Sequence, residues 1–199
     1  MAVEEPDYTI ERAADGYELR RYPPLVIAST AVQASAADAG NRAFRVLAGY
    51  IFGDNRARES IAMTAPVTQA RAEKIAMTAP VTQQAAGSDE TWTVSFVMPA
   101  QYTLDTLPIP DDARVQLAEV PARVVAVRRY SGTWSQRRYQ RELGELREAL
   151  KRDGVVIIGE PIFARYNSPF SLPPLRRNEI WIEVAPAPSA PIALPSNTR

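Results

Sequence analysis

The chain has 199 residues, of which 46% are hydrophobic, and its 23 basic and 23 acidic residues give a formal net charge of zero. This balance provides no electrostatic attraction to nucleic acid or to an anionic membrane. The chain has neither cysteine nor histidine. Their absence excludes disulfides, thiolate nucleophiles and cysteine-ligated metal centres, and it removes the usual general base and the commonest transition-metal ligand.

No apolar run approaches the roughly 20 residues that cross a bilayer, and the opening MAVEEPDY lacks the basic and apolar regions of a signal peptide. The sequence therefore predicts a soluble, cytoplasmic protein without a membrane span, and it leaves open whether a leader has been removed. Residues 185–199 are rich in proline and alanine. We expect them to form a disordered tail after a single domain at residues 1–184.

The chain opens with the pattern of a β-hairpin. The stretches YTIER and YELRRY flank Ala13–Gly16, where Asp15-Gly16 is a turn signal. A continuous strand, LVIASTAV, follows the break at Pro23-Pro24. Residues 36–52 then favour an amphipathic helix. Its predicted buried face consists of Ala39, Ala43, Leu47, Tyr50 and Ile51.

The nine residues IAMTAPVTQ occur twice, at 61–69 and at 75–83. Apolar residues alternate with small or polar ones in each copy, which predicts strands with one buried face that can pair as a hairpin. Proline cannot donate to a ladder, so each strand should be irregular or at an edge near its proline. Two interpretations remain open. The repeat is either a duplicated strand that supplies sheet and core, or a structure whose Met63 and Met77 line a pocket for a flat apolar ligand.

The second half of the chain repeats the order of the first. ELRRYPPLVIA at 18–28 aligns without gaps with QLAEVPARVVA at 116–126, and IAMTAPVT at 61–68 aligns with VIIGEPIF at 156–163. A helix is predicted at 134–152, and each half closes with a further strand, TWTVSFV or NEIWIEV. These correspondences predict one α+β domain of two related halves, with two helices packed on antiparallel sheet.

Four stretches together resemble the SOUL/haem-binding-protein family. They are YTIERAADGYELRRYPPLVIA, the IAMTAPV segment, the helix after SGTW and the ending ARYNSPFSLPPLRRNEIWIEV. The resemblance implies a distorted antiparallel β-barrel of two pseudo-symmetric halves with two flanking helices, similar to gyrase-inhibitor-like and effector-binding domains. It also implies, by analogy, reversible binding of haem or a related tetrapyrrole in an apolar cleft, in a carrier, buffer or sensor role.

In that family the proposed pocket lies between the first helix and the loop before the last strand. The implied apolar contacts, with Met77 of the second repeat copy included, are Phe44, Leu47, Ile51, Met63, Met77, Phe170, Leu172 and Leu175. Arg176 and Arg177 are the implied partners of the haem propionates. Ordinary loop packing is the alternative for the loop residues, and a solvated face is the alternative for the arginines. Because histidine is absent, Met, Tyr, Lys or no side chain would coordinate the iron, and no metal ligand is predicted.

Two other classes of function remain as alternatives. The sequence contains no usual Ser-centred triad and no glycine-rich phosphate loop, so we predict no catalytic residues and no enzymatic activity. Glu179 and Glu183 flank Trp181 on one face of the last strand. They form either a site for a cationic or polar effector or solvated strand positions. The third interpretation is a protein-interaction module with no haem role.

Overall fold

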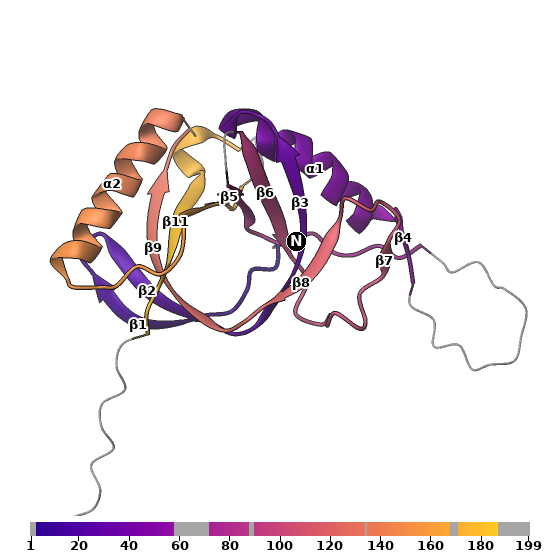
Figure 1. Cartoon of the computed structure of the whole chain (residues 1–199), viewed down its shortest axis with the longest axis horizontal. Coiled ribbons are helices and arrows are strands. Elements are labelled where there is room, and N and C mark those ends of the chain that lie inside the picture. The colour runs from indigo at the N-terminus through magenta and orange to yellow at the C-terminus, as the bar shows by residue number, and fades with distance from the viewer. Residues whose placement is uncertain (1–2, 58–71, 88–89, 134, 168–170, 187–199) are drawn as a thin grey trace, which may run out of the picture.

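A computed structural model describes residues 3–57, 72–87, 90–133, 135–167 and 171–186 (Figure 1). Its helices are α1 (Ala36–Phe52), α2 (Gln136–Arg152) and the short 3-10 helix η1 (Pro173–Leu175). Its strands are β1 (Thr9–Ala14), β2 (Tyr17–Tyr22), β3 (Leu25–Gln33), β4 (Asn55–Arg56), β5 (Val81–Ala85), β6 (Thr91–Val97), β7 (Ile109–Pro110), β8 (Gln116–Val120), β9 (Arg123–Ser131), β10 (Ile162–Arg165) and β11 (Arg177–Val184). The opening hairpin and both predicted helices are confirmed.

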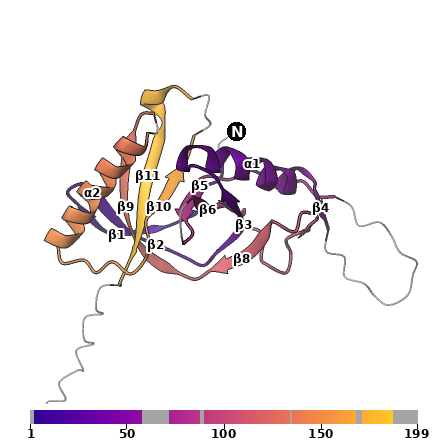
Figure 2. The same ribbon diagram turned by 45° about the horizontal axis from the view of Figure 1, so that its top comes forward.

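Nine of these strands form one antiparallel sheet in the order β1-β2-β9-β11-β10-β5-β6-β3-β8. The sheet is strongly curled and carries the two helices (Figures 1 and 2). If β1 is set aside, the order reads the same from either end once β2 is exchanged with β8, β3 with β9, β5 with β10 and β6 with β11. A pseudo-two-fold axis therefore passes between β5 and β10. The predicted α+β fold of two pseudo-symmetric halves is confirmed.

The aligned stretches of the two halves pair directly with each other. β2 pairs with β9, where Glu18 lies opposite Val127, and β3 pairs with β8, where Ser29 lies opposite Gln116. Glu18 and Gln116 are counterparts in the sequence alignment, and Ser29 and Val127 continue it. The two ladders consequently share one register. The alignment found in the sequence corresponds to a symmetric pair of ladders that joins the halves.

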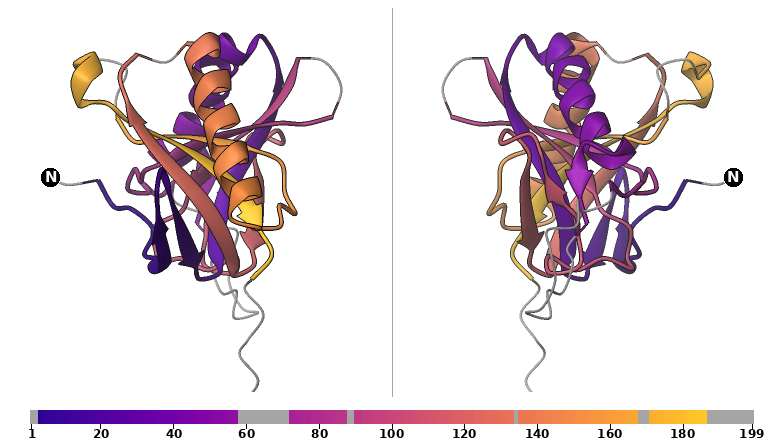
Figure 3. Two further views of the ribbon diagram at one scale, coloured as in Figure 1. Left: turned by 90° about the vertical axis from the view of Figure 1, so that its left-hand side faces the viewer. Right: turned by 90° about the vertical axis from the view of Figure 1, so that its right-hand side faces the viewer.

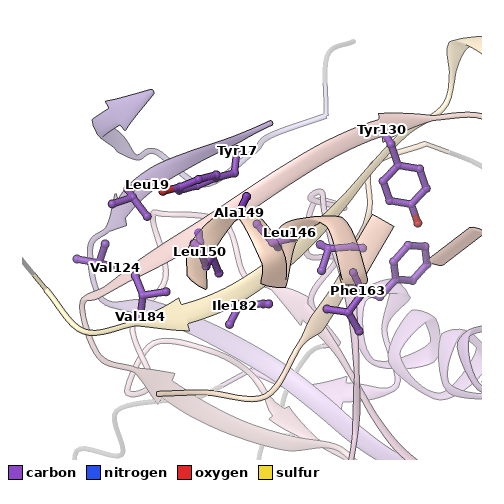
Figure 4. Close-up of a cluster of buried hydrophobic side chains, with 13 residues drawn as sticks. Tyr17, Leu19, Val124, Tyr130, Leu146, Ala149, Leu150, Phe163, Ile182 and Val184 are labelled. Carbon is purple, nitrogen blue, oxygen red and sulfur yellow. The ribbon is translucent and has the colours of Figure 1, made fainter. Parts of the chain in front are cut away.

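Each helix packs its apolar face on its own half of the sheet. α1 lies against β3 and β6, and its predicted face is buried, with Leu47 at 0% and Ile51 at 1% exposure. α2 buries Leu143, Leu146 and Leu150 in a second core cluster that includes residues of β9 and β11 (Figure 4). The 3.6-residue period of the apolar positions was therefore a sufficient signal for both helices.

The second copy of IAMTAPVTQ is not the regular strand that its alternation predicts. Only its last three residues belong to β5, and Met77 is 37% exposed whereas Ile75 is 3% exposed. Pro80 directly precedes β5 and has no N–H to donate, so the ladder starts after it. Both edges of β5 are occupied, one by β6 and the other by β10. The first copy lies outside the described residues.

β5 is the counterpart of β10. It begins directly after Pro80, as β10 begins directly after Pro161. The second copy, and not the first, therefore corresponds to residues 156–163, and the predicted alignment of 61–68 with that stretch is wrong. Two identical copies give the same alignment score, so only the pairing partners in the sheet distinguish them.

Candidate functional site

The residues predicted on α1 divide between core and surface. Leu47 and Ile51 belong to the buried cluster that holds α1 on the sheet. Phe44 is 39% exposed, and its ring contacts that of Phe96 at a centroid distance of 5.6 Å. Of these three predicted contacts, Phe44 alone reaches the surface to an extent that would let a ligand touch it.

The loop before β11 presents two leucines to solvent. Leu172 is 67% exposed and Leu175 is 72% exposed. Leu175 ends η1, which contacts β9 and lies beside the end of β9 that leads toward α2 (Figure 3). Exposed leucines of this extent carry an unfavourable hydration cost that a bound apolar ligand would remove. The predicted contacts Phe170 and Met63 lie outside the described residues.

The two predicted propionate partners are engaged with the protein itself. Arg176 donates from Nε to the Ser171 carbonyl oxygen at 2.8 Å. Arg177 donates from Nη1 to Glu5 at 2.8 Å and from Nε to Glu179 at 2.9 Å, and its guanidinium lies 3.7 Å from the centroid of the Tyr166 ring. The interpretation of the two arginines as a solvated face is therefore wrong for Arg177, which belongs to an ion-paired cluster.

That cluster centres on Glu179, whose side chain is completely buried. Its carboxylate accepts two bonds from Arg20 Nη1 at 3.2 Å, and one each from the Tyr166 hydroxyl and the Trp181 indole N–H at 2.8 Å. The interpretation of Glu179 as a solvated strand position is wrong. Glu183 agrees better with a solvated position, because its side chain is 36% exposed. Its carboxylate lies 3.6 Å from Arg123.

Glu179 and Tyr166 each have one dominant protonation state at neutral pH. Burial disfavours the carboxylate, but Arg20, Trp181, Arg177 and Tyr166 outweigh burial and lower the pKa of Glu179. Burial, reinforced by the charge of Glu179, raises the pKa of Tyr166. The cluster therefore holds an ionised carboxylate and a neutral phenol. Neither Glu179 nor Tyr166 is poised to exchange a proton near neutral pH, as a general acid or base must.

Two cavities lie elsewhere on the described surface. One, of about 630 Å³, is lined by Ser135, Arg137, Arg138 and Arg141 at the start of α2. The other, of about 410 Å³, lies between the N-terminal segment, the Pro23-Pro24 bend and the residues after β6. The exposed leucines and the α1 face are absent from the described lining of both. Sequence reasoning did not find the first cavity, although three arginines within five residues were a visible signal.

Metal-binding and membrane-spanning features are absent from the part of the chain that the structure describes. It contains no group of three or more acidic side chains arranged to hold a metal ion. None of its helices is long and apolar enough to cross a membrane. The Met77 side chain is 37% exposed, so its thioether is accessible from solvent.

Comparison with solved structures supports the fold. The C-terminal domain of EcmrR matches with a TM-score of 0.61 and 10% identity, over 90% of this chain and 99% of that domain. A structure described as a hydrolase from Listeria innocua matches with a TM-score of 0.53 and 9% identity, over 93% of this chain and 94% of that one. At such low identity these matches show a shared fold alone.

Comparison of sequences establishes the family. A sequence model described as SOUL heme-binding protein matches residues 3–183. Heme-binding protein 2 of Mus musculus is 31% identical over 189 residues, which cover 92% of this chain and 86% of the relative. Heme-binding protein 2 of Homo sapiens is 31% identical over 188 residues, with the same coverage. The chain therefore belongs to the SOUL heme-binding protein family.

Proposed function

We propose that this protein binds haem or a related tetrapyrrole reversibly, without a histidine ligand, in a carrier, buffer or sensor role. The observation that carries the proposal is the exposure of Leu172 and Leu175, at 67% and 72%, on the loop before β11. Family membership supports the class of ligand. Two solvent-exposed leucines on one loop supply an apolar surface on which a flat macrocycle can lie.

Binding without a histidine is physically sufficient for a reversible interaction. A tetrapyrrole plane that buries several hundred Å² gains on the order of 5–10 kcal/mol at about 25 cal/mol per Å², before the costs of ordering and association. By area alone, before those costs, this gain covers the roughly 8 kcal/mol of micromolar affinity, and the costs weaken it toward a readily reversible range that suits exchange between partners. Iron coordination is not needed to reach it, although the Met77 thioether is available at the surface.

Binding, rather than catalysis, is the activity that the residues support. The chain has no histidine or cysteine, and its completely buried carboxylate, Glu179, is held in its ionised form by four neighbours. The word hydrolase belongs to a structural relative at 9% identity.

An effector site at Glu179 is the second candidate, because a buried carboxylate beside Tyr166 and Trp181 is a suitable partner for an organic cation. In this chain, however, the carboxylate is already neutralised by Arg20 and Arg177. An external cation would have to displace two guanidinium groups, and this would leave them without their buried partner. The structure therefore favours a structural role for Glu179.

Titration of haemin into the purified protein, followed by the Soret band, tests the tetrapyrrole proposal. We expect a saturable shift with one haem per chain. The double variant Leu172→Asp/Leu175→Asp should weaken binding by about tenfold or more, because burial of one leucine contributes about 1.5–3 kcal/mol. Ile158→Asp is the control, since Ile158 is 57% exposed and its N–H donates to the Glu183 carbonyl, near the end of β11 that lies away from the loop.

The methionine variants Met63→Ala and Met77→Ala complete the set. Affinity equal to that of the unmodified protein in each variant would show that neither Met63 nor Met77 is required to hold the iron. Loss of the shift in one of them would identify an axial ligand and place that copy of the repeat at the site. Absence of any saturable shift in the unmodified protein at micromolar concentration would refute haem binding for this chain. An equal loss in Ile158→Asp would refute the loop as the contact surface.

A further inference from the structure

Three arginines surround the cavity at the start of α2. Arg137, Arg138 and Arg141 line this space of about 630 Å³ together with Ser135. Its volume lies in the range of small-molecule sites, about 300–1,000 Å³. Arg137 and Arg141 are exposed and Arg138 is half-buried, so their guanidinium groups are accessible to a ligand that enters from solvent.

The charges around this cavity do not cancel. Arg128, Arg138 and Arg141 share the two carboxylates of Glu142 and Glu145. Arg137 adds a fourth cation to the same turn of the helix. The group therefore carries four positive and two negative charges, an excess of two. Electrostatic complementarity favours a ligand with two negative charges.

Arg138 is held in place by the chain that leads into α2. Its guanidinium lies 5.7 Å from the ring centroid of Tyr130, and it packs against Gly132, where a Cβ atom would come within 2.3 Å of Nη1. Gly132 has a φ of +106°, and its carbonyl accepts from buried Asn178 at 3.1 Å. This corner is built from both β9 and β11, so at least one of the three guanidinium groups is positioned before a ligand arrives.

The same corner adjoins the loop with the exposed leucines. Arg177 and Asn178 at the start of β11 pair with Ser131 and Tyr130 at the end of β9, and η1 contacts β9. Figures 1 and 3 show η1 beside the end of β9 from which the chain enters α2. An apolar loop and a cationic cavity thus lie on either side of one short connection.

We propose that the arginine cavity at the start of α2 binds the propionate groups of a tetrapyrrole whose macrocycle lies against the loop before β11. This inference rests on the proposed function and assigns the carboxylate end of the ligand to Arg137, Arg138 and Arg141. Both propionates leave one edge of the macrocycle, so a single cationic site can bind them together. Bidentate guanidinium–carboxylate bonds are the expected contacts.

The assignment differs from the one that the sequence suggested. Arg177 is bound to Glu5 and Glu179, and its removal from Glu179 would leave a buried carboxylate undercompensated. Arg137 is exposed and can rotate toward a ligand at little cost. Arg141 donates to the buried carboxylate of Glu142 at 2.7 Å, but Arg128 also donates to Glu142, at 2.9 Å, so this carboxylate keeps a guanidinium partner when Arg141 turns toward a ligand. The α2 cluster is therefore the better source of cations.

Comparison of haemin with its dimethyl ester tests this site, because the ester has the same macrocycle without the carboxylates. The double variant Arg137→Glu/Arg141→Glu should weaken haemin binding by about tenfold or more and leave binding of the ester unchanged. Arg147→Glu/Lys151→Glu is the matched control. It makes the same change in net charge at exposed positions further along α2, outside the described lining of the cavity.

The outcomes separate this inference from the proposed function. Equal haemin affinity in the unmodified protein and both variants would refute the arginine site while haem binding stands. An equal loss of haemin affinity in the control variant would show that the effect comes from net charge alone, and this would also refute the arginine site. Failure of the unmodified protein to bind haemin would refute both proposals. If the double variant unfolds, the ratio of haemin to ester affinity in the unmodified protein decides, since the site requires haemin to bind more tightly.

Discussion

Glu179 shows how a single buried carboxylate organises this protein. Its oxygens are bonded by Arg20, Arg177, Tyr166 and Trp181, so the side chain connects β2, β11 and the residue after β10. Arg20 is itself only 3% exposed. Both charges are therefore taken from water together, and each relies on the other for compensation.

Glu179→Gln should destabilise the fold by about 3 kcal/mol at pH 7, because it leaves two guanidinium groups without their buried counter-charge. Urea unfolding measures the change. Glu183→Gln, on the same strand but partly exposed and 3.6 Å from Arg123, is the control and should cost less than about 1 kcal/mol. Equal losses in the two variants would contradict the central role of Glu179.

The lowered pKa of Glu179 makes the stability difference between the unmodified protein and Glu179→Gln depend on pH. A carboxyl group with a depressed folded-state pKa stabilises the fold fully above its unfolded pKa of about 4.3, and this contribution is lost as the pH falls through the folded pKa. The gap between the unmodified protein and Glu179→Gln should therefore be constant from pH 7 to 6 and narrow below about pH 4. A gap that stays constant down to pH 3 would contradict the depressed pKa.

Sequence reasoning placed Glu179 beside Trp181 but could not show that it is buried. Alternation along a strand tells which residues share a face, not whether another part of the chain covers that face. The decisive partner, Arg20, lies 159 positions away, and Glu5, the second partner of Arg177, lies 172 positions from it. Contacts at this separation depend on the topology of the sheet.

At the scale of elements, α1 is a structural helix whose predicted ligand face is mostly core. Its apolar period was enough to predict residues 36–52, because helical periodicity is local. Leu47 and Ile51 were correctly predicted as buried and also proposed as ligand contacts. The two assignments compete, since a side chain that is fully packed against a sheet has no surface left for a ligand.

Leu47→Ala separates these two assignments. The substitution should cost about 2–5 kcal/mol of stability, because Leu47 is completely buried and the cavity left behind cannot fully collapse. Haemin affinity, measured at a temperature where the variant remains folded, should stay unchanged. A loss of haemin affinity with little loss of stability would instead show that Leu47 contacts the ligand.

β5 illustrates what the pattern of an element cannot reveal. Both copies of IAMTAPVTQ have the same alternation, yet β5 begins only after Pro80 and pairs with β6 and β10. Strand formation requires partners, and an isolated strand pattern does not specify them. This is why the helices were predicted to within two residues, while the alignment of the repeat was assigned to the wrong copy.

At the scale of the whole molecule, the duplication explains the fold, and the proposed site lies where the two halves differ. The two halves exchange strands across a pseudo-two-fold axis between β5 and β10. The halves differ where the second one carries its arginines, at Arg137, Arg138 and Arg141. We infer that the symmetric scaffold supplies stability, and that the asymmetric residues of the second half supply recognition.

We propose that this chain holds a tetrapyrrole by its apolar plane and its carboxylates, without relying on iron. The most direct measurement compares the dissociation constants of haemin and of metal-free protoporphyrin IX for the unmodified protein. We expect saturable one-to-one binding of both, with affinities within about threefold, because loss of an iron–ligand bond would cost far more than the roughly 0.65 kcal/mol that a factor of about three represents. Haemin that binds a hundredfold more tightly than protoporphyrin IX would contradict iron-independent binding and establish a side-chain ligand to the iron.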